Sequence, residues 1–289
     1  MALDLVKNLK PTVNINIPSY LRLSLINLVA GYRQEQGRES LKDMLNARNS
    51  EDMRGLTEAY KCSNINDTLS KVSKHIDTVV EALEGLGYVT LIKKNVVLLT
   101  RLAIGLNNPY TEPLEPAISW DPYWNLPYIP ASSLKGAMRA VAYNNKSPCL
   151  SAFGTQNESS TVIVLDAYPV YCPRERGLLT LDILNPHYRE TEGEVSEVQS
   201  KPTPLPFLTI SRGVGLKVVV MAAKNRIRER LIEGKCGSKD AGDYIYTNAN
   251  CDKVCTRREF ERIITDALEG GIGAKTALGY GVFNIHEKR

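Results

Sequence analysis

The residues best suited to chemistry gather in two stretches, one mid-chain and one near its end. In the first, Ser132 and Ser133 follow Pro130, and Lys135 and Arg139 lie one helical turn apart. Pro130 presets a helical φ, and either serine can cap the free N–H groups of a first helical turn. The positive end of the helix would then face the same point as the two cations. This pattern predicts a helix start that binds phosphate or another anion.

The second stretch, residues 270–281, holds five glycines together with Lys275 and Tyr280. A backbone that lacks Cβ atoms can approach a ligand closely and direct its N–H groups at phosphate. A capped helix or a glycine loop is by itself more often structural. Their occurrence in one chain predicts two walls of a single binding surface, with Gly271, Gly273, Lys275 and Tyr280 in the second wall.

Other chemistries find less support in the residues. A phosphate-binding loop of the G-x-x-x-x-G-K-[ST] type would need glycine where Glu269 and Ala274 stand, so ATP or GTP binding is not expected. Metal-independent RNA cleavage needs a general base, which His187 or Tyr188 can supply, and this remains the alternative catalytic hypothesis. No third ligand completes a metal site, no G-x-S-x-G motif surrounds the serines, and no cofactor is expected.

Composition limits the class of protein. The chain has 289 residues, 43% of them hydrophobic, and a net charge of +4, which is too small to indicate nucleic-acid binding by itself. The segment 207–235, which includes Arg212, is the basic part of the chain. No run of about 18 apolar residues and no signal-peptide pattern is seen, so we expect a cytoplasmic protein without a membrane partner.

Three of the six cysteines, Cys236, Cys251 and Cys255, fall in a polar segment. A zinc site would lack a fourth ligand close in sequence. Unlinked thiols are the simplest expectation, and a disulfide is the alternative if the source is a hyperthermophile.

The elements that must position these residues form an α+β pattern. Residues 1–88 carry helical apolar stripes, and at Tyr88 the period changes to that of strands. A proline-rich excursion, 107–130, holds Trp120 and Trp124, which either stack on bases or form a small core. The acidic segment 189–197 reads as a mobile loop. Beyond residue 88 we expect strands at 96–106, 161–170 and 178–184, a strand pair at 207–211 and 216–222, a last strand at 281–286, and helices at 131–143, 224–233 and 256–268. This order fits a ferredoxin-like β-α-β-β-α-β core, 89–289, behind a helical N-terminal extension.

The motifs also carry a family resemblance. The run Ile129-Pro-Ala-Ser-Ser-Leu-Lys-Gly136 with Arg139, and the segment 271–281, resemble the signature and the glycine-rich loop of the RAMP superfamily, the RNA-binding subunits of CRISPR effector complexes. Residues 99–105, 185–188 and 202–208 are similar to the sixth-subunit family of the type III-B (Cmr) complexes.

The resemblance implies a ferredoxin-like (RRM-like) core that binds guide RNA (crRNA) near its 3′ end, beside the other Cmr subunits, in a complex that targets invader RNA in antiviral defence. It implies a subunit that is not an enzyme, and contacts to RNA backbone phosphates instead of base edges. The acidic turn after Tyr188 departs from the family pattern, so no RNA contact is assigned to 189–197. The expected RNA-binding residues are Ser132, Ser133, Lys135, Arg139, Arg212, Gly271, Gly273, Lys275 and Tyr280.

Overall fold

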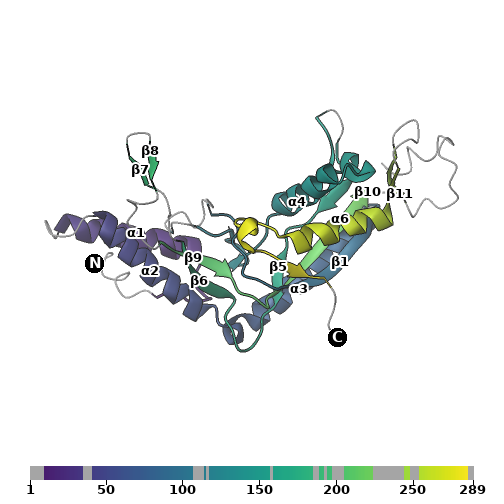
Figure 1. Cartoon of the computed structure of the whole chain (residues 1–289). Helices are drawn as coiled ribbons and strands as arrows, with labels where there is room; N and C mark the ends of the chain where they lie inside the picture. The colour runs from purple at the N-terminus through teal and green to yellow at the C-terminus, as the bar shows by residue number, and fades with distance from the viewer. Residues whose placement is uncertain are drawn as a thin grey trace.

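The computed structural model describes residues 10–34, 41–106, 114, 117–156, 159–184, 189–191, 194–196, 205–223, 244–247 and 254–285. They form a mixed α/β fold, shown in Figure 1. The helices are α1 (Ile17–Gln34), α2 (Leu41–Ala59), α3 (Cys62–Gly85), α4 (Ala131–Asn144) and α6 (Arg257–Gly270), with short 3-10 turns at Pro148–Phe153 and Thr276–Leu278. The strands are β1 (Tyr88–Leu98), β2 (Trp120–Asp121), β3 (Leu126–Pro127), β4 (Val162–Val164), β5 (Tyr168–Tyr171), β6 (Leu179–Leu184), β7 (Arg189–Thr191), β8 (Glu194–Ser196), β9 (Leu205–Ile210), β10 (Gly215–Ala223), β11 (Tyr244–Thr247), β12 (Val254–Thr256) and β13 (Phe283–Asn284).

The first part of the chain is helical, as predicted. The stripe on α3 is buried at Leu69, Val72, Ile76 and Val80, which recur at the spacing of one helix face. The helix ends at Gly85, and the chain then turns into β1. The helical stripe thus predicted the position of α3, whereas the strand after it begins at Tyr88 and not at the predicted residue 96.

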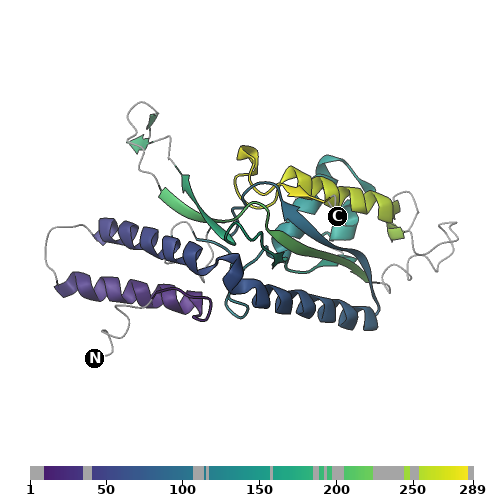
Figure 2. The ribbon, with the colours of Figure 1, turned by 90° about the horizontal axis from the view of Figure 1, so that it is seen from below.

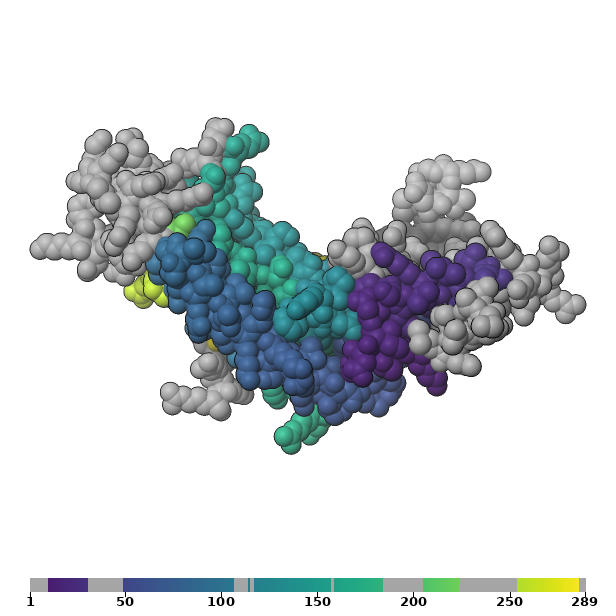
Figure 3. All heavy atoms as spheres, turned by 180° about the vertical axis from the view of Figure 1, so that it is seen from behind, coloured from purple at the N-terminus to yellow at the C-terminus, as the bar shows by residue number. Residues whose placement is uncertain are grey.

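A central antiparallel sheet carries the rest of the fold. Its strand order is β13-β1-β10-β4, and β5 also pairs with β10. Every residue of β10 from Gly215 to Ala222 is buried, because helices cover both faces of the sheet. Figures 1 and 2 show α3 along one face and the pair α4 and α6 along the other. Figure 3, seen from behind, shows α1 and α3 running along the outer side of the molecule.

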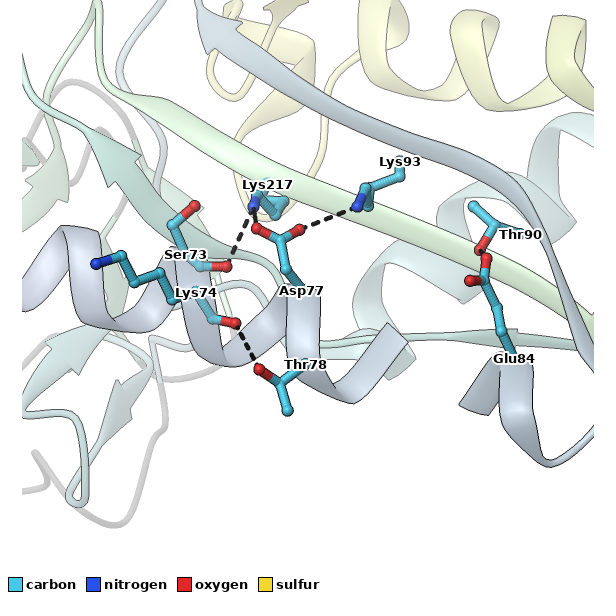
Figure 4. Close-up of polar contacts among 8 residues, drawn as sticks. All are labelled: Ser73, Lys74, Asp77, Thr78, Glu84, Thr90, Lys93 and Lys217. Atoms are coloured by element: carbon cyan, nitrogen blue, oxygen red, sulfur yellow. Dashed lines mark hydrogen bonds and ion pairs between the residues drawn. The ribbon is translucent and has the colours of Figure 1, made fainter. Parts of the chain in front are cut away.

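A buried lysine of the sheet holds α3 in place. Lys217 on β10 is 7% exposed, and its Nζ lies 2.9 Å from Asp77 Oδ2 and donates to the Ser73 carbonyl oxygen at 3.2 Å. Lys93 on β1 donates to the other oxygen of Asp77, at 3.1 Å (Figure 4). The boundary predicted at residue 88 stays a prediction, but α3 packs directly on the sheet that follows it.

The predicted pairing of 207–211 with 216–222 is wrong. Strand β9 pairs with β6, in register from Leu205 to Ile210, whereas β10 pairs with β1, β4 and β5. The turn between them, with Gly213 at φ +87°, carries the chain from one sheet into the other. Both segments are mainly apolar and buried, and such segments indicate burial without indicating which strand is the partner.

Several smaller segments also differ from expectation. Strand β1 runs over 88–98 instead of 96–106, and beyond it Leu102 and Ala103 make isolated bridges to Ile210 and Ala274. The segment predicted to be a mobile loop contains the β7–β8 pair, and β11 pairs with β12, which was not predicted. The predicted helix at 224–233 lies outside the described residues. None of the described helices is long and apolar enough to cross a membrane.

Two disulfides connect distant parts of the chain, Cys62 to Cys172 and Cys149 to Cys255, with Cα–Cα distances of 5.5 and 4.5 Å. The expectation of an unlinked thiol at Cys255 is therefore wrong. Its partner stands 106 residues away, a pairing that local spacing does not reveal. Cys236 and Cys251 lie outside the described residues.

The two tryptophans pack within the fold. Trp120 is fully buried, donates its Nε1–H to Asn125 Oδ1 at 3.2 Å, and meets the Tyr60 ring edge-on. Its predicted alternative role as a base-stacking platform is therefore wrong. Trp124 is half-buried and lies against His75 and Tyr123, its ring centroid 5.2 Å from the imidazole.

Candidate nucleic-acid interface

The predicted helix start exists, but its cap is not a serine. Helix α4 begins at Ala131 with Pro130 in the cap position, and no side chain of the cap residue binds the helix. Instead, Asp166 Oδ1 accepts a hydrogen bond from the Ala131 N–H at 2.6 Å. Since Ser132 and Ser133 stand inside the first turn, neither can cap it, and a resident carboxylate already lies at the positive end of α4.

The cations of α4 differ in how they are placed. Lys135 is half-buried, and its Nζ donates to the Val162 carbonyl oxygen at 3.2 Å, so the ammonium lies at the start of strand β4. Burial lowers the pKa of Lys135. Arg139 and Ser132 are exposed. The RNA-binding roles assigned to these residues, and to Ser133, stay predictions.

The glycine-rich stretch is a loop bonded along its length to the segment 101–103. Ala274 N donates to Ala103 O and Gly281 N donates to Arg101 O, both at 2.8 Å. Gly273, at φ +93°, faces that segment so closely that a Cβ atom there would overlap the Ala103 carbonyl oxygen. Gly273 thus serves the close approach of two backbones, which is a structural use of the freedom predicted for ligand contact.

Tyr280 ends this loop within a small polar network. Its hydroxyl donates to Asp182 Oδ2, and the guanidinium of Arg101 lies 2.8 Å from the same oxygen. Burial, followed by the hydrogen bond to Asp182, raises the pKa of Tyr280. The Lys275 ammonium lies 5.3 Å from the centre of the Phe207 ring. The Asp182 carboxylate on β6 is thereby bonded both to the glycine loop and to the segment that follows β1.

Beside this network lies a cleft of about 590 Å³, hereafter the arginine cleft. Three arginines reach it from different segments, Arg101 after β1, Arg176 before β6 and Arg212 after β9. Its remaining lining residues are Leu99, Thr100, Thr180, Leu278, Gly279 and Tyr280. None of the described residues that line the cleft is acidic. Converging guanidinium groups, hydroxyls and a tyrosine suit a phosphodiester backbone.

The structure brings only some of the predicted residues together. Arg212 and Tyr280 line the arginine cleft, whereas Lys135 and Arg139 do not. Helices α4 and α6 lie side by side, and Figure 1 shows the start of α4 and the loop that follows α6 toward the same end of that pair.

Sequence reasoning missed Arg101 and Arg176. Arg101 had a visible signal, as the one charged residue within an apolar run. His187 and Tyr188 lie outside the described residues, and within the described part no group of three or more His, Cys, Asp or Glu side chains gathers to hold a metal.

Comparison with known proteins places this geometry in a family. The RAMP superfamily profile matches residues 95–284. The chain belongs to the RAMP superfamily. The match includes the start of α4, the arginine cleft and the glycine loop of this RAMP protein.

Two curated relatives and one solved structure narrow the comparison. The chain is 28% identical over 218 residues to the CRISPR system CMR subunit Cmr6 of Saccharolobus solfataricus, covering 74% of this chain and 64% of that relative. It is 29% identical over 136 residues to the CRISPR system Cmr subunit Cmr6 of Pyrococcus furiosus, covering 45% of this chain and 32% of that relative. The matches thus span less than two thirds of either relative's length. A chain in the cryo-EM structure of the type III-B Cmr-beta complex bound to cognate target RNA has the same fold, with a TM-score of 0.70 at 23% identity and coverage of 99% of this chain and 95% of that chain.

Proposed function

We propose that this RAMP protein is a sixth-subunit component of a type III-B CRISPR effector complex, and that its arginine cleft holds the backbone of the guide RNA near its 3′ end. The names of both curated relatives and the shared fold support the place in the complex. The observation that carries the RNA-binding role is the convergence of Arg101, Arg176 and Arg212 on one cleft, whose described lining residues include no carboxylate. Target RNA and the other Cmr subunits are the further partners of this proposal.

The proposal includes a ferredoxin-like core. The elements β1, α4, β4 with β5, β10, α6 and β13 follow one another in the order β-α-β-β-α-β, and the antiparallel order β13-β1-β10-β4 supports it. In this arrangement the last strand and the glycine loop before it return to the edge of β1. The core therefore brings Arg101 and Tyr280, far apart in sequence, to one site.

A guide-binding subunit must accept any sequence, so it is expected to contact phosphates and the shape of the strand. Arginines suit this role because each guanidinium presents planar, paired N–H groups to phosphate oxygens. Thr100 and Thr180 add hydroxyl donors at the cleft, and the ring of Tyr280 can lie against any base. Asp182 orients both Arg101 and Tyr280 and is a positioning residue in this proposal.

The test compares Arg212→Ala with Arg258→Ala. Both residues are exposed, and Arg258 stands at the start of α6, the opposite end of that helix from the glycine loop. Binding of labelled single-stranded guide RNA is measured over a salt series. Arg212→Ala should weaken binding and reduce the log–log salt slope by about 0.7, the value for one lost phosphate contact on a single strand. Equal affinity and equal slope in the two variants would refute the arginine cleft as the RNA site.

The proposed subunit is not an enzyme, and the alternative is a metal-independent endoribonuclease that uses His187 and Tyr188. The two are separated by incubating the purified protein with repeat RNA in EDTA. A product that ends in a cyclic phosphate, lost in His187→Ala, would establish the alternative. A third possibility is a subunit that contacts only other proteins. Crosslinking to RNA in the assembled complex would distinguish it from the RNA-binding subunit and from the endoribonuclease.

A further inference from the structure

A second basic hollow lies on the other side of Arg176. It has a volume of about 810 Å³ and is bounded by α3 and by the segment 170–176 that follows β5; we call it the α3 groove. Arg176 lines both this groove and the arginine cleft, so the two hollows meet at one side chain. The polar residues that bear on its chemistry are Ser70, Ser73, Lys74, Tyr171, Arg174 and Arg176.

The cations of the α3 groove are exposed and unpaired within the described structure. Lys74, Arg174 and Arg176 make no ion pair with another described residue, whereas Lys71 on the same helix pairs with Asp67. Figure 4 shows Lys74 extending away from the Asp77 ion pair. Among the described residues that line the groove, Glu175 is the one acidic side chain. A hollow with three such cations attracts an anionic ligand.

One aromatic side chain points to nucleic acid as that ligand. Tyr171, at the end of β5, is 55% exposed and lines the groove beside the arginines. Its ring stands over Gly215, whose missing side chain leaves the tyrosine close to the backbone of β10. A cationic groove with an exposed aromatic ring is the arrangement by which proteins bind single strands, because phosphates meet the cations and bases stack on the ring. An acidic peptide would use the cations but has no need of the ring.

We propose that the α3 groove binds single-stranded RNA and continues the path of the strand held in the arginine cleft. The inference rests on the proposed function and extends it to a second surface. Ser70 and Ser73 supply hydroxyl donors along the wall formed by α3. The strand would pass over Arg176, which can contact phosphates on both sides.

The segment 170–176, which forms one wall of the groove, is anchored to the start of α3 near both of the segment's ends, and this lowers the cost of binding. Cys172 is joined by its disulfide to Cys62 at the start of α3. At the other end, Gly177 pairs with Lys61, and Leu178 N donates to the Tyr60 carbonyl oxygen at 2.9 Å. The segment that carries Arg174 and Arg176 is thus tied to α3 before any ligand arrives, so little conformational entropy is lost when RNA binds.

The experiment compares the double variant Lys74→Ala/Arg174→Ala with a control that removes the same charge outside the groove, Lys71→Ala/Arg258→Ala. The probe is a labelled oligouridine, measured by fluorescence anisotropy over a salt series. The groove variant should bind more weakly and lose about 1.4 from its log–log slope, two single-strand contacts, while the control changes less. A 4-thiouridine probe should crosslink to Tyr171 in the wild-type protein. Equal thermal unfolding of the two variants serves as the folding control.

The outcomes separate this inference from the proposed function. If Arg212→Ala weakens binding but the groove variant behaves as its control and no crosslink forms at Tyr171, the α3 groove inference is wrong and the arginine cleft stands. If neither Arg212→Ala nor the groove variant differs from its control, both proposals fail. A groove variant that keeps its RNA slope but no longer joins the assembled complex identifies the groove as a protein-docking surface, which also overturns the inference.

Discussion

Replacing Asp77 with alanine should destabilise the protein more than replacing Lys217 with methionine, although both changes remove the same ion pair. The side chain of Lys217 is 8% exposed, whereas that of Asp77 is 37% exposed. Asp77→Ala leaves the buried ammonium with the Ser73 carbonyl oxygen as its remaining acceptor. In Lys217→Met, Asp77 stays partly hydrated and keeps its bond to Lys93.

The magnitudes follow from this difference in burial. A buried charge that loses its partner costs about 2–3 kcal/mol, since part of its desolvation is no longer offset. Methionine follows the course of the lysine chain and adds no unpaired group, so Lys217→Met should cost about 1 kcal/mol or less. The two costs differ by about 1–2 kcal/mol, and at about 2–4 °C per kcal/mol the midpoints of thermal unfolding should differ by roughly 2–8 °C.

Thermal unfolding followed by circular dichroism at several pH values shows which variant is less stable and whether the charge of Asp77 causes the difference. The hydrogen bond from Lys217 is the largest cause that lowers the pKa of Asp77 below its ordinary value of 3.8. The carboxylate therefore stabilises the folded state above that value, and its contribution is lost as the pH falls through the lower folded-state pKa. The gap between wild type and Asp77→Ala should narrow in acid. Equal losses, or a larger loss in Lys217→Met, would refute the reasoning.

Three further predictions concern the loop, the disulfides and the helix start. Gly273→Ala should cost about 3 kcal/mol of stability, because its Cβ would overlap a backbone oxygen at positive φ, whereas Gly279→Ala, with φ +83° and open space, should cost about 1 kcal/mol. Urea unfolding measures both costs, and equal costs would contradict the close approach at Gly273. Cys149→Ser should lower the free energy of unfolding by up to about 4–5 kcal/mol, because the disulfide to Cys255 closes a loop with a sequence separation of 106 residues. A denaturation midpoint that the mutation leaves unchanged would argue against the pairing. Asp166→Ala should lose about 1 kcal/mol of stability because it removes the cap of α4, yet its RNA affinity should stay equal or increase because a negative charge leaves the start of that helix. Weaker RNA binding by a folded variant would contradict this prediction.

The local elements of this fold could be predicted from sequence. The helix expected at 131–143 is α4 at 131–144, and that expected at 256–268 is α6 at 257–270. In both, an apolar stripe at helical spacing marks the buried face, and Thr256 caps α6 by accepting from the Glu259 N–H at 3.2 Å. The partners of the strands could not be predicted, because β9 and β10 are both mainly apolar and buried and show no alternation that would fix their register.

Only some residues of the candidate site could be predicted from the sequence, for a related reason. The glycine loop and Arg212 stood out by residue type, but Arg176 lies in an ordinary turn of proline and arginine. Its place between two hollows depends on the disulfide from Cys172 to Cys62, 110 residues away, and on the bridge from Gly177 to Lys61. Contacts between residues so far apart in the sequence follow from the folded topology, and no local sequence pattern predicts them.

The cations of this protein fall into two groups that contribute differently to stability. Lys217 and Arg101 each bind a carboxylate of another element, and Arg257, which pairs with Glu261 of its own helix, donates to the Leu91 carbonyl oxygen of β1. The exposed Arg174 and Arg212 make no ion pair with another described residue. Because an exposed ion pair contributes only about 0–1 kcal/mol, leaving these arginines unpaired costs the fold little, while their charge stays available for phosphate. Their removal should lower RNA affinity at constant thermal stability, whereas removal of a paired cation lowers thermal stability. Loss of binding without loss of stability therefore distinguishes a contact residue from a structural one.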